Sequence, residues 1–290
     1  MPLLVLMGLP EDLAGLVPEP VRKSVPRRYD VVGDIAVLSL PGELYNYGPE
    51  IAEVVIKNRR HIKTVLNRVS MAWGEKRLAR FDVLAGCSTV TTHREYGVPY
   101  RLDLSRVFFN PSLACERNRV ASLISRGETV LVPFAGIGPF VVPVAMKGAF
   151  VVAVEINSDA VGWLCENVRT NGVRDRVTVI EGDARDVSLY ADRTFDRAIL
   201  PAPYGMDSIP GIISPFVRPG GFIHFYTFKK DEQIPGLISS LQDEGLETAL
   251  WRRCGAVAPG VWRFVFDLEK ICEPVERRYD RRVLGSAGNE

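Results

Sequence analysis

Short apolar runs alternate with amphipathic segments through the C-terminal two thirds of this 290-residue chain. The longest amphipathic segment, from Ser158 to Asn171, begins with a suitable N-cap and ends before a glycine, as helices do. The predicted strands are Thr129–Phe134, Phe150–Val154, Val177–Ile180, Phe195–Leu200, Gly220–Phe228, Glu247–Trp251 and Val261–Leu268, with a further helix near Asp231–Glu244. This alternation predicts an α/β fold with a doubly wound, mostly parallel sheet whose last two strands form an antiparallel hairpin edge.

The first 110 residues mix helix-like and strand-like segments instead of alternating them. The predicted elements are a short helix within residues 9–26, strand segments on both sides of Gly33 between Tyr29 and Leu40, a helix over Pro49–Lys57, and strands over Phe81–Ala85 and Tyr100–Phe109. A helix that ends at about Ile124 then follows Asn110–Arg119. We therefore predict a small α+β domain over residues 1–110, an α/β domain over 111–275 and a loosely ordered tail over 276–290.

The turn after the first parallel strand carries the clearest chemical signal. Gly136 and Gly138 allow the backbone to turn sharply, and Pro139 suits the first turn of a helix. The next strand ends in Glu155, a carboxylate that can accept hydrogen bonds from both hydroxyls of a ribose. A plain turn between a strand and a helix would show the same glycines, but the acid favours a nucleoside cofactor.

Phe140 stands where a dinucleotide-binding loop has its third glycine, so the loop gives little support for pyrophosphate binding. S-adenosylmethionine, which has a ribose but no phosphate, fits better. Asp183 follows the third strand, faces the same cleft, and can accept a hydrogen bond from an adenine amino group. The predicted cofactor-binding residues are Phe134, Ala135, Gly136, Gly138, Glu155, Ile156, Asp183, Ala184 and Pro201.

Charge is balanced overall but clustered locally. The chain has 36 basic and 35 acidic residues, so any affinity for nucleic acid must come from a local cluster of cations. Between Lys57 and Arg80 there are eight Lys or Arg and a single acid, Glu75. Because cations near phosphates release condensed counterions, this segment is a candidate phosphate-binding face. A solvated surface helix and loop is the alternative interpretation.

Cysteines and histidines give no sign of a metal centre. The five cysteines include no C-x-x-C pair, and the three histidines lie far apart in the sequence, so neither a metal site nor a disulfide framework is predicted. The apolar N-terminal run is shorter than a membrane span and has no basic residues before it. We expect a soluble, cytoplasmic, monomeric protein that has no contact with membranes.

Several motifs follow one another in a fixed order from about Tyr29 to Leu268. They are Tyr29–Ala36, Lys63–Leu66, Gly74–Gly86, Cys115–Arg117, Phe134–Phe140 and Ala258–Trp262. In these motifs the chain resembles the archaeal and eukaryotic tRNA methyltransferases that methylate N1 of guanosine at position 37, beside the anticodon. The resemblance implies a class I methyltransferase fold, S-adenosylmethionine as the cofactor, and the anticodon stem-loop region of tRNA as the partner.

The resemblance also implies catalytic roles. In that family a glutamate is the general base for the N1 proton, and Glu116 stands in its place, followed by Arg117. An arginine that holds the guanine O6 matches Arg77, and Pro203 matches the last proline of an Asn-Leu-Pro element in the base pocket. Guanine N1 is protonated at neutral pH, so a base must remove the proton while a cation stabilises charge on O6. The alternative role for Glu116 is a favourable interaction with a helix dipole.

Three positions depart from the family pattern: Pro133 replaces an aspartate, Ser112 an arginine and Pro201 an asparagine. A sister family transfers the 3-amino-3-carboxypropyl group of S-adenosylmethionine to a tricyclic base at the same tRNA position, and it lacks the last two residues as well. Gly138–Phe140 and Gly74–Leu78 match the methyltransferases. Methyl transfer is therefore the predicted reaction, aminocarboxypropyl transfer is the alternative, and a non-catalytic RNA-binding protein on this fold is the second alternative.

Overall fold

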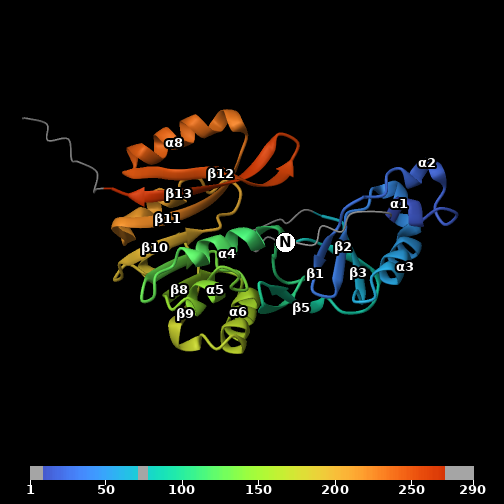
Figure 1. The fold of residues 1–290 in the computed structure, drawn as a ribbon, viewed down its shortest axis with the longest axis horizontal. Helices are drawn as coiled ribbons and strands as arrows, with labels where there is room; N and C mark the ends of the chain where they lie inside the picture. Colours follow the sequence, from blue (N-terminus) through green and yellow to red (C-terminus); the bar gives the residue numbers. More distant parts are fainter. Residues whose placement is uncertain (1–8, 71–77, 272–290) are drawn as a thin grey trace, which may run out of the picture.

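The computed structural model describes residues 9–70 and 78–271, and in these ranges the strands form three sheets. A four-stranded sheet and the first helices make an N-terminal lobe, and a seven-stranded sheet with its helices makes a larger C-terminal lobe (Figure 1). A two-stranded hairpin lies between the two lobes. The predicted domain boundary at residue 110 stays a prediction.

The N-terminal lobe is built around a mixed sheet in the order β1-β2-β3-β4. Its elements are α1 (Leu9–Asp12), α2 (Glu19–Arg22), β1 (Asp30–Val32), β2 (Ile35–Leu38), α3 (Gly48–Asn58), β3 (Thr64–Arg68) and β4 (Phe81–Ala85). Gly33 turns β1 into β2 with a φ of 59°, a backbone conformation that glycine adopts without strain. Helix α3 buries Ile51 and Val55 in the core of the lobe and makes the crossover between the parallel strands β2 and β3.

The hairpin between the lobes corrects the sequence-based prediction. It consists of β5 (Val90–Glu95), which was not predicted, and β6 (Val98–Asp103), which ends earlier than expected. Strand β5 was missed because its Val-Thr-Thr-His-Arg-Glu sequence has no apolar alternation. Strand β6 ends at Asp103, whose carboxylate accepts hydrogen bonds from the backbone N and the Oγ of Ser105 at 2.9 and 2.7 Å, which forms a turn.

The C-terminal lobe has the predicted doubly wound sheet, in the order β12-β13-β11-β10-β7-β8-β9. Its strands are β7 (Thr129–Pro133), β8 (Phe150–Glu155), β9 (Val177–Glu181), β10 (Phe195–Leu200), β11 (Val217–Lys229), β12 (Leu246–Ala258) and β13 (Val261–Lys270). The first five are parallel, and β13 is antiparallel to both β11 and β12. The predicted hairpin edge is therefore confirmed, although its two strands are longer than the apolar pattern indicated.

Helices cover both faces of this sheet. They are α4 (Ala114–Ser122), α5 (Val141–Met146), α6 (Ser158–Thr170), α7 (Ile209–Ile213) and α8 (Ile234–Asp243). The N-cap of α6 is Asn157, whose side chain accepts a hydrogen bond from Asp159 N, and not the predicted Ser158. Asn167, buried in α6, bonds to the backbone of Arg101 in β6 and of Ile137 in the glycine loop, so it ties the hairpin to the C-terminal lobe.

Helix α4 has few apolar residues and is held on the sheet by charge. Arg119 donates two hydrogen bonds to the Asp267 carboxylate, at 2.6 and 3.0 Å, and His224 Nδ1 donates a third at 2.6 Å. His224 Nε2 accepts from Arg197 at 2.7 Å, which fixes the neutral tautomer, and burial lowers the pKa of His224. Burial alone would raise the pKa of Asp267, but His224 and Arg119 lower it to about 2.

No helix in residues 9–70 and 78–271 is long and apolar enough to cross a membrane.

Candidate active site and RNA groove

The loop between β7 and α5 holds the backbone in unusual conformations. Phe134, Gly136 and Gly138 all have positive φ angles, of 58°, 56° and 92°. A Cβ on Gly138 would meet Leu164 Cδ1 of α6 at 2.5 Å, so this glycine is needed for the helix to approach the loop. Phe134 is not a glycine, and a non-glycine residue held at positive φ stores strain of the kind that is found at ligand sites.

Glu155, at the end of β8, is bound directly to this loop. Its Oε2 accepts a hydrogen bond from Gly136 N at 2.7 Å, and its Oε1 accepts one from Asn157 N at 2.9 Å. These two bonds fix the carboxylate at the carboxyl end of the parallel strands, and each oxygen keeps a lone pair for a further donor. A Cβ on Gly136 would meet nothing within 4 Å, so the space above the loop is open. A ribose fits this arrangement, with one hydroxyl for each carboxylate oxygen.

Asp183 follows β9 and lies at the same end of the sheet. Arg185 binds its carboxylate through Nε and a terminal nitrogen, at 2.9 and 2.5 Å, and this lowers the pKa of Asp183. To accept a hydrogen bond from an adenine amino group, the Asp183 carboxylate would therefore have to bind Arg185 and the adenine at the same time. Ala184 is buried and Ile156 is partly buried, so both can contribute apolar contacts beside the two acids.

The segment after β10 forms a neighbouring wall. Pro201 and Pro203 are partly buried, and Ala202 between them is fully packed. Tyr204 is 73% exposed, and its ring lies 5.9 Å from that of Phe228 on β11. An exposed tyrosine at the carboxyl ends of parallel strands is a suitable stacking surface for a planar ligand.

Glu116, in α4, is linked to the end of the glycine loop through Tyr226. Its buried carboxylate accepts hydrogen bonds from Tyr226 Oη at 3.2 Å, from Arg119 Nε at 3.0 Å, and from Arg252 of β12. The Tyr226 ring is 5.3 Å from that of Phe140, the N-cap residue of α5. Burial and the nearby Glu116 raise the pKa of Tyr226, so its hydroxyl stays a donor.

Tyr226 and Arg252 were not predicted as partners of Glu116. They are separated from it by 110 and 136 residues, and no motif signals their approach. The side chain of Arg252 is 46% exposed and that of Arg119 is 22% exposed, so Arg252 is the more accessible of the two cations that bind Glu116.

Arg117 points away from Glu116, and its guanidinium is held by other residues. Its guanidinium binds both oxygens of Glu95 at 2.7 and 2.5 Å and donates to Asn110 O at 3.0 Å. Glu95 also pairs with His93 Nε2 at 3.3 Å, and His93 Nδ1 accepts from Gly33 N at 3.1 Å. Burial would raise the pKa of Glu95, but hydrogen bonds from His93 and Arg117 lower it. The predicted catalytic role of Arg117 is untested, and Arg77 lies outside the described residues.

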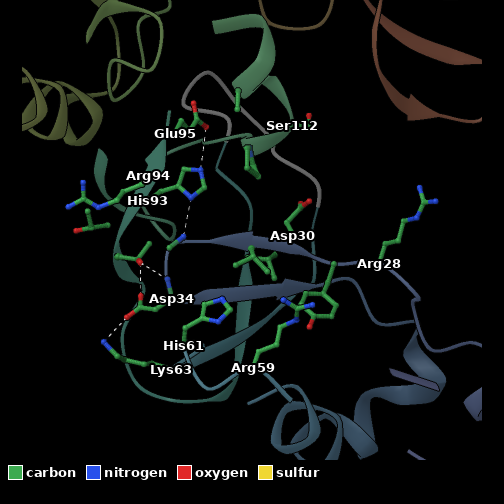
Figure 2. A pocket seen from close by; sticks show the side chains of 18 of the residues that line it. Arg28, Asp30, Asp34, Arg59, His61, Lys63, His93, Arg94, Glu95 and Ser112 are labelled. Atoms are coloured by element: carbon green, nitrogen blue, oxygen red, sulfur yellow. Dashed lines mark hydrogen bonds and ion pairs between the residues drawn. The ribbon is translucent and has the colours of Figure 1, made fainter. Parts of the chain in front are cut away.

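A groove of about 1390 Å³ separates the N-terminal lobe from the C-terminal lobe, next to the hairpin (Figure 2). Its lining includes the cations Arg28, Arg59, Lys63 and Arg94 from the N-terminal lobe and β5, the acids Asp30, Asp34 and Glu95, and Gly255 and Ala256 from β12. Arg59 and Lys63 belong to the predicted basic face, part of which lies outside the described residues. Lys63 is paired with Asp34 at 3.0 Å (Figure 2). The cations of this groove are suited to contacts with the phosphates of a nucleic-acid strand.

The described part of the chain contains no group of three or more His, Cys, Asp or Glu side chains arranged to hold a metal ion.

Comparison with known families gives two matches that together cover most of the chain. The profile of the TRM5/TYW2 methyltransferase domain matches residues 91–242, and that of the TYW2 N-terminal domain matches residues 9–89. The two matched ranges cover the N-terminal lobe and most of the hairpin and C-terminal lobe.

Two curated relatives differ in how much of their length the chain covers. The tRNA (guanine(37)-N(1))-methyltransferase Trm5b of Pyrococcus abyssi is 36% identical over 214 residues, which are 73% of this chain and 63% of that protein. The tRNA(Phe) (4-demethylwyosine(37)-C(7)) aminocarboxypropyltransferase of Pyrococcus horikoshii is 32% identical over 268 residues, which are 89% of this chain and 94% of that protein. The chain thus spans less than two thirds of the first protein and nearly all of the second.

Solved structures of both kinds share the fold. The complex of aTrm5 with tRNALeu has a TM-score of 0.81 at 28% identity, covering 91% of this chain and 78% of that chain. M. jannaschii TYW2 in complex with AdoMet has a TM-score of 0.61 at 25% identity, covering 84% and 100%. These matches confirm the predicted fold and cofactor: the chain belongs to the TRM5/TYW2 methyltransferase family, whose enzymes use S-adenosylmethionine.

Proposed function

We propose that this protein transfers the methyl group of S-adenosylmethionine to N1 of guanosine at position 37 of tRNA. The observation that carries the proposal is the buried Glu116 carboxylate, placed by Tyr226 and Phe140 beside the glycine loop. The 36% identity to Trm5b, which is named for this reaction, supports it.

The cofactor would be held by the residues already placed at the carboxyl ends of β7 to β10. Glu155 would accept the ribose hydroxyls, Asp183 the adenine amino group, and the backbone around Gly136 would face the methionine part. Ala135, Ile156, Ala184 and Pro201 would supply the remaining contacts. When bound, S-adenosylmethionine supplies an electrophilic methyl group on a sulfonium.

Glu116 would remove the N1 proton of the target guanine. In the structure all three of its hydrogen-bond donors are protein groups, so one of them has to yield its place to the base. Arg252 is the donor best placed to do so, because it is partly exposed on the edge strand β12, whereas Tyr226 is buried and Arg119 is held by Asp267. Catalysis would then depend on holding N1 in line with the methyl group.

The basic groove would position the tRNA. Its cations come from the N-terminal lobe and the hairpin, and β12 forms the opposite wall with residues three and four positions after Arg252. A phosphate backbone in this groove would therefore lie next to the strand that carries the Glu116 partner. Counterion release by cations such as Arg59 would supply affinity without sequence preference.

A transfer assay with two labels tests the proposal. Purified protein is incubated with tRNA transcripts carrying guanosine at position 37 and with S-adenosylmethionine labelled on the methyl or on the carboxypropyl carbons. We expect methyl label in the RNA, and its loss when guanosine 37 is replaced by adenosine. Methyl label that persists in the adenosine transcript would contradict the proposed target.

Aminocarboxypropyl transfer to a tricyclic base at the same position is the second candidate. Two observations favour it: the N-terminal lobe matches the TYW2 N-terminal domain, and the chain covers 94% of the P. horikoshii aminocarboxypropyltransferase. Glu116 would serve as the base in this reaction too, because C7 of the tricyclic base loses its proton when it forms the bond to the carboxypropyl carbon and the carbon–sulfur bond of the cofactor breaks. Carboxypropyl label entering tRNA that already bears the tricyclic base would establish it. Absence of both labels from RNA would leave a non-catalytic RNA-binding protein as the function.

A further inference from the structure

Arg263, on β13, is a buried cation without an acidic partner. It is only 7% exposed, yet within residues 9–70 and 78–271 its guanidinium makes no hydrogen bond or ion pair. It makes a cation–π contact with the Phe228 ring, whose centroid lies 5.1 Å away. The other buried charged side chains of the described chain, such as Arg117, Arg197 and Lys270, all have hydrogen-bonding partners.

Such an arrangement is costly for the isolated protein. Burial lowers the pKa of the Arg263 guanidinium, although its nitrogens keep some contact with solvent. A buried charge is normally paired and hydrogen-bonded, and violations of this rule are concentrated at functional sites. Arg263 therefore has unused donors that an incoming ligand can satisfy.

The position of Arg263 indicates which ligand that is. Arg263 pairs with Phe228 across β11 and with Gly255 across β12, and Gly255 lines the basic groove. A Cβ on Gly255 would lie 3.7 Å from a terminal nitrogen of Arg263, so the guanidinium lies directly beside this groove-lining residue.

The neighbouring residues on the same face belong to the Glu116 cluster. Val265, two residues along β13 and thus about 7 Å away, pairs with Tyr226 and Arg252, the two residues that bind Glu116. Phe228 in turn contacts the exposed Tyr204 ring. The guanidinium thus lies between the candidate base and the groove, against an aromatic pair.

We propose that Arg263 binds the edge of the target purine that carries O6 and N7. This inference rests on the proposed function. In guanine N1, O6 and N7 follow one another along one side of the base, so a base with N1 at Glu116 can place its O6 and N7 side toward Arg263. The planar fork of arginine is suited to these two acceptors, and flipped bases are commonly held by aromatic rings.

A binding cycle tests this without relying on catalysis. Anticodon stem-loop RNA with guanosine or 7-deazaguanosine at position 37 is titrated against wild type and Arg263→Gln in the presence of S-adenosylhomocysteine. We expect the loss of N7 to weaken binding to wild type about tenfold, Arg263→Gln to weaken binding of the guanosine RNA by a similar factor, and the two changes together to cost no more than either alone.

Matched variants separate recognition from folding. Arg263→Lys keeps the charge but loses the fork, so it should not restore the dependence on N7. Arg253→Gln should keep that dependence. This variant removes a cation of the neighbouring strand β12 that is paired with Asp231. Thermal unfolding of Arg263→Gln should occur at the wild-type temperature or higher, because an unpaired buried charge is removed. A purely structural role, through the Phe228 contact, would lower it.

Two results would overturn the inference. If the penalties of Arg263→Gln and 7-deazaguanosine multiply, Arg263 binds another group, such as the phosphate of the target nucleotide. If Arg263→Gln binds both RNAs with the wild-type affinities, Arg263 contacts neither N7 nor the phosphate. The label assay is independent of this cycle, so a failure of methyl transfer in that assay and a failure of N7 coupling here are distinguishable.

Discussion

Glu116 and Arg117 are adjacent in α4, and both are buried, but their surroundings differ. Arg117 is locked between two oxygens of Glu95 and a backbone carbonyl, and it joins the hairpin to the helix. Glu116 faces the sheet, and one of its partners, Arg252, reaches it from a partly exposed position on the edge strand. Successive residues of a helix point about 100° apart. The two neighbours therefore face different surroundings: Arg117 faces the buried pair with Glu95, and Glu116 faces partners that include the partly exposed Arg252. Burial of a charge thus does not by itself distinguish a structural carboxylate or cation from a candidate catalytic one.

The largest expected effect comes from replacing Glu116. Glu116→Gln keeps the size of the side chain but removes the base, so we expect turnover to fall about 10²- to 10⁴-fold. Affinity for S-adenosylmethionine, measured by calorimetry, should stay nearly unchanged, because Glu155 and the glycine loop are untouched. Turnover equal to that of wild type would show that Glu116 is a structural carboxylate like Glu95.

Replacing Arg117 should affect folding more than chemistry. Arg117→Met leaves Glu95 buried without its main partner, and breaking one side of a buried pair costs about 3–5 kcal/mol of unfolding free energy. We expect the urea midpoint to fall accordingly, while turnover per folded molecule changes little. Glu95→Gln is the matched variant from the other side of the pair. A large loss of turnover in a variant that remains fully folded would instead place Arg117 in the reaction.

The Asp267 pair anchors the Glu116 side of α4 and gives a pH test. Its folded pKa of about 2 lies below the ordinary value, so its contribution is fully present above the ordinary pKa and is lost as the pH falls through about 2. After allowance for partial exposure, we expect about 1–2 kcal/mol of stability to disappear over this window. Asp267→Asn should remove that part of the acid transition in urea titrations. An unchanged acid limb would show that other carboxylates dominate it.

The smallest expected effect is in the groove. Arg59 has no ion-pair partner among the described residues, whereas Lys63 is paired with Asp34. We therefore expect Arg59→Ala to weaken tRNA binding a few-fold and to reduce the salt slope by about 1, as for one lost phosphate contact. Lys63→Ala, the matched control, should have less effect. Fluorescence anisotropy across a salt series measures both, and equal slopes for wild type and Arg59→Ala would remove Arg59 from the RNA interface.

The parts of the fold that were predicted correctly have strong local patterns. The parallel strands from Thr129 to Leu200 are short and mostly apolar, and their ends were placed within a residue or so. Strand β5 was missed because its polar side chains bond to neighbours in the N-terminal lobe, as Thr91 does with Asp34, and such bonds leave no periodicity. The long strands β11 to β13 were predicted too short because charged residues interrupt or end their apolar runs, while the strands continue through pairing with one another.

The sequence by itself determined the fold class, the glycine loop and the acid that binds it. These lie within one β-α-β unit, where Gly136 and Glu155 are 19 residues apart and the chain connectivity alone brings them together. Only the tertiary structure decided the surroundings of Glu116, the engagement of Arg117 and the unpaired state of Arg263. Two partners of Glu116, Tyr226 and Arg252, come from strands more than 100 residues away, whose register is set by pairing along the β11-β13-β12 edge, and no local pattern encodes that register. Arg117 is bound by Glu95 of the hairpin, 22 residues away, on a strand that has no apolar alternation to reveal it.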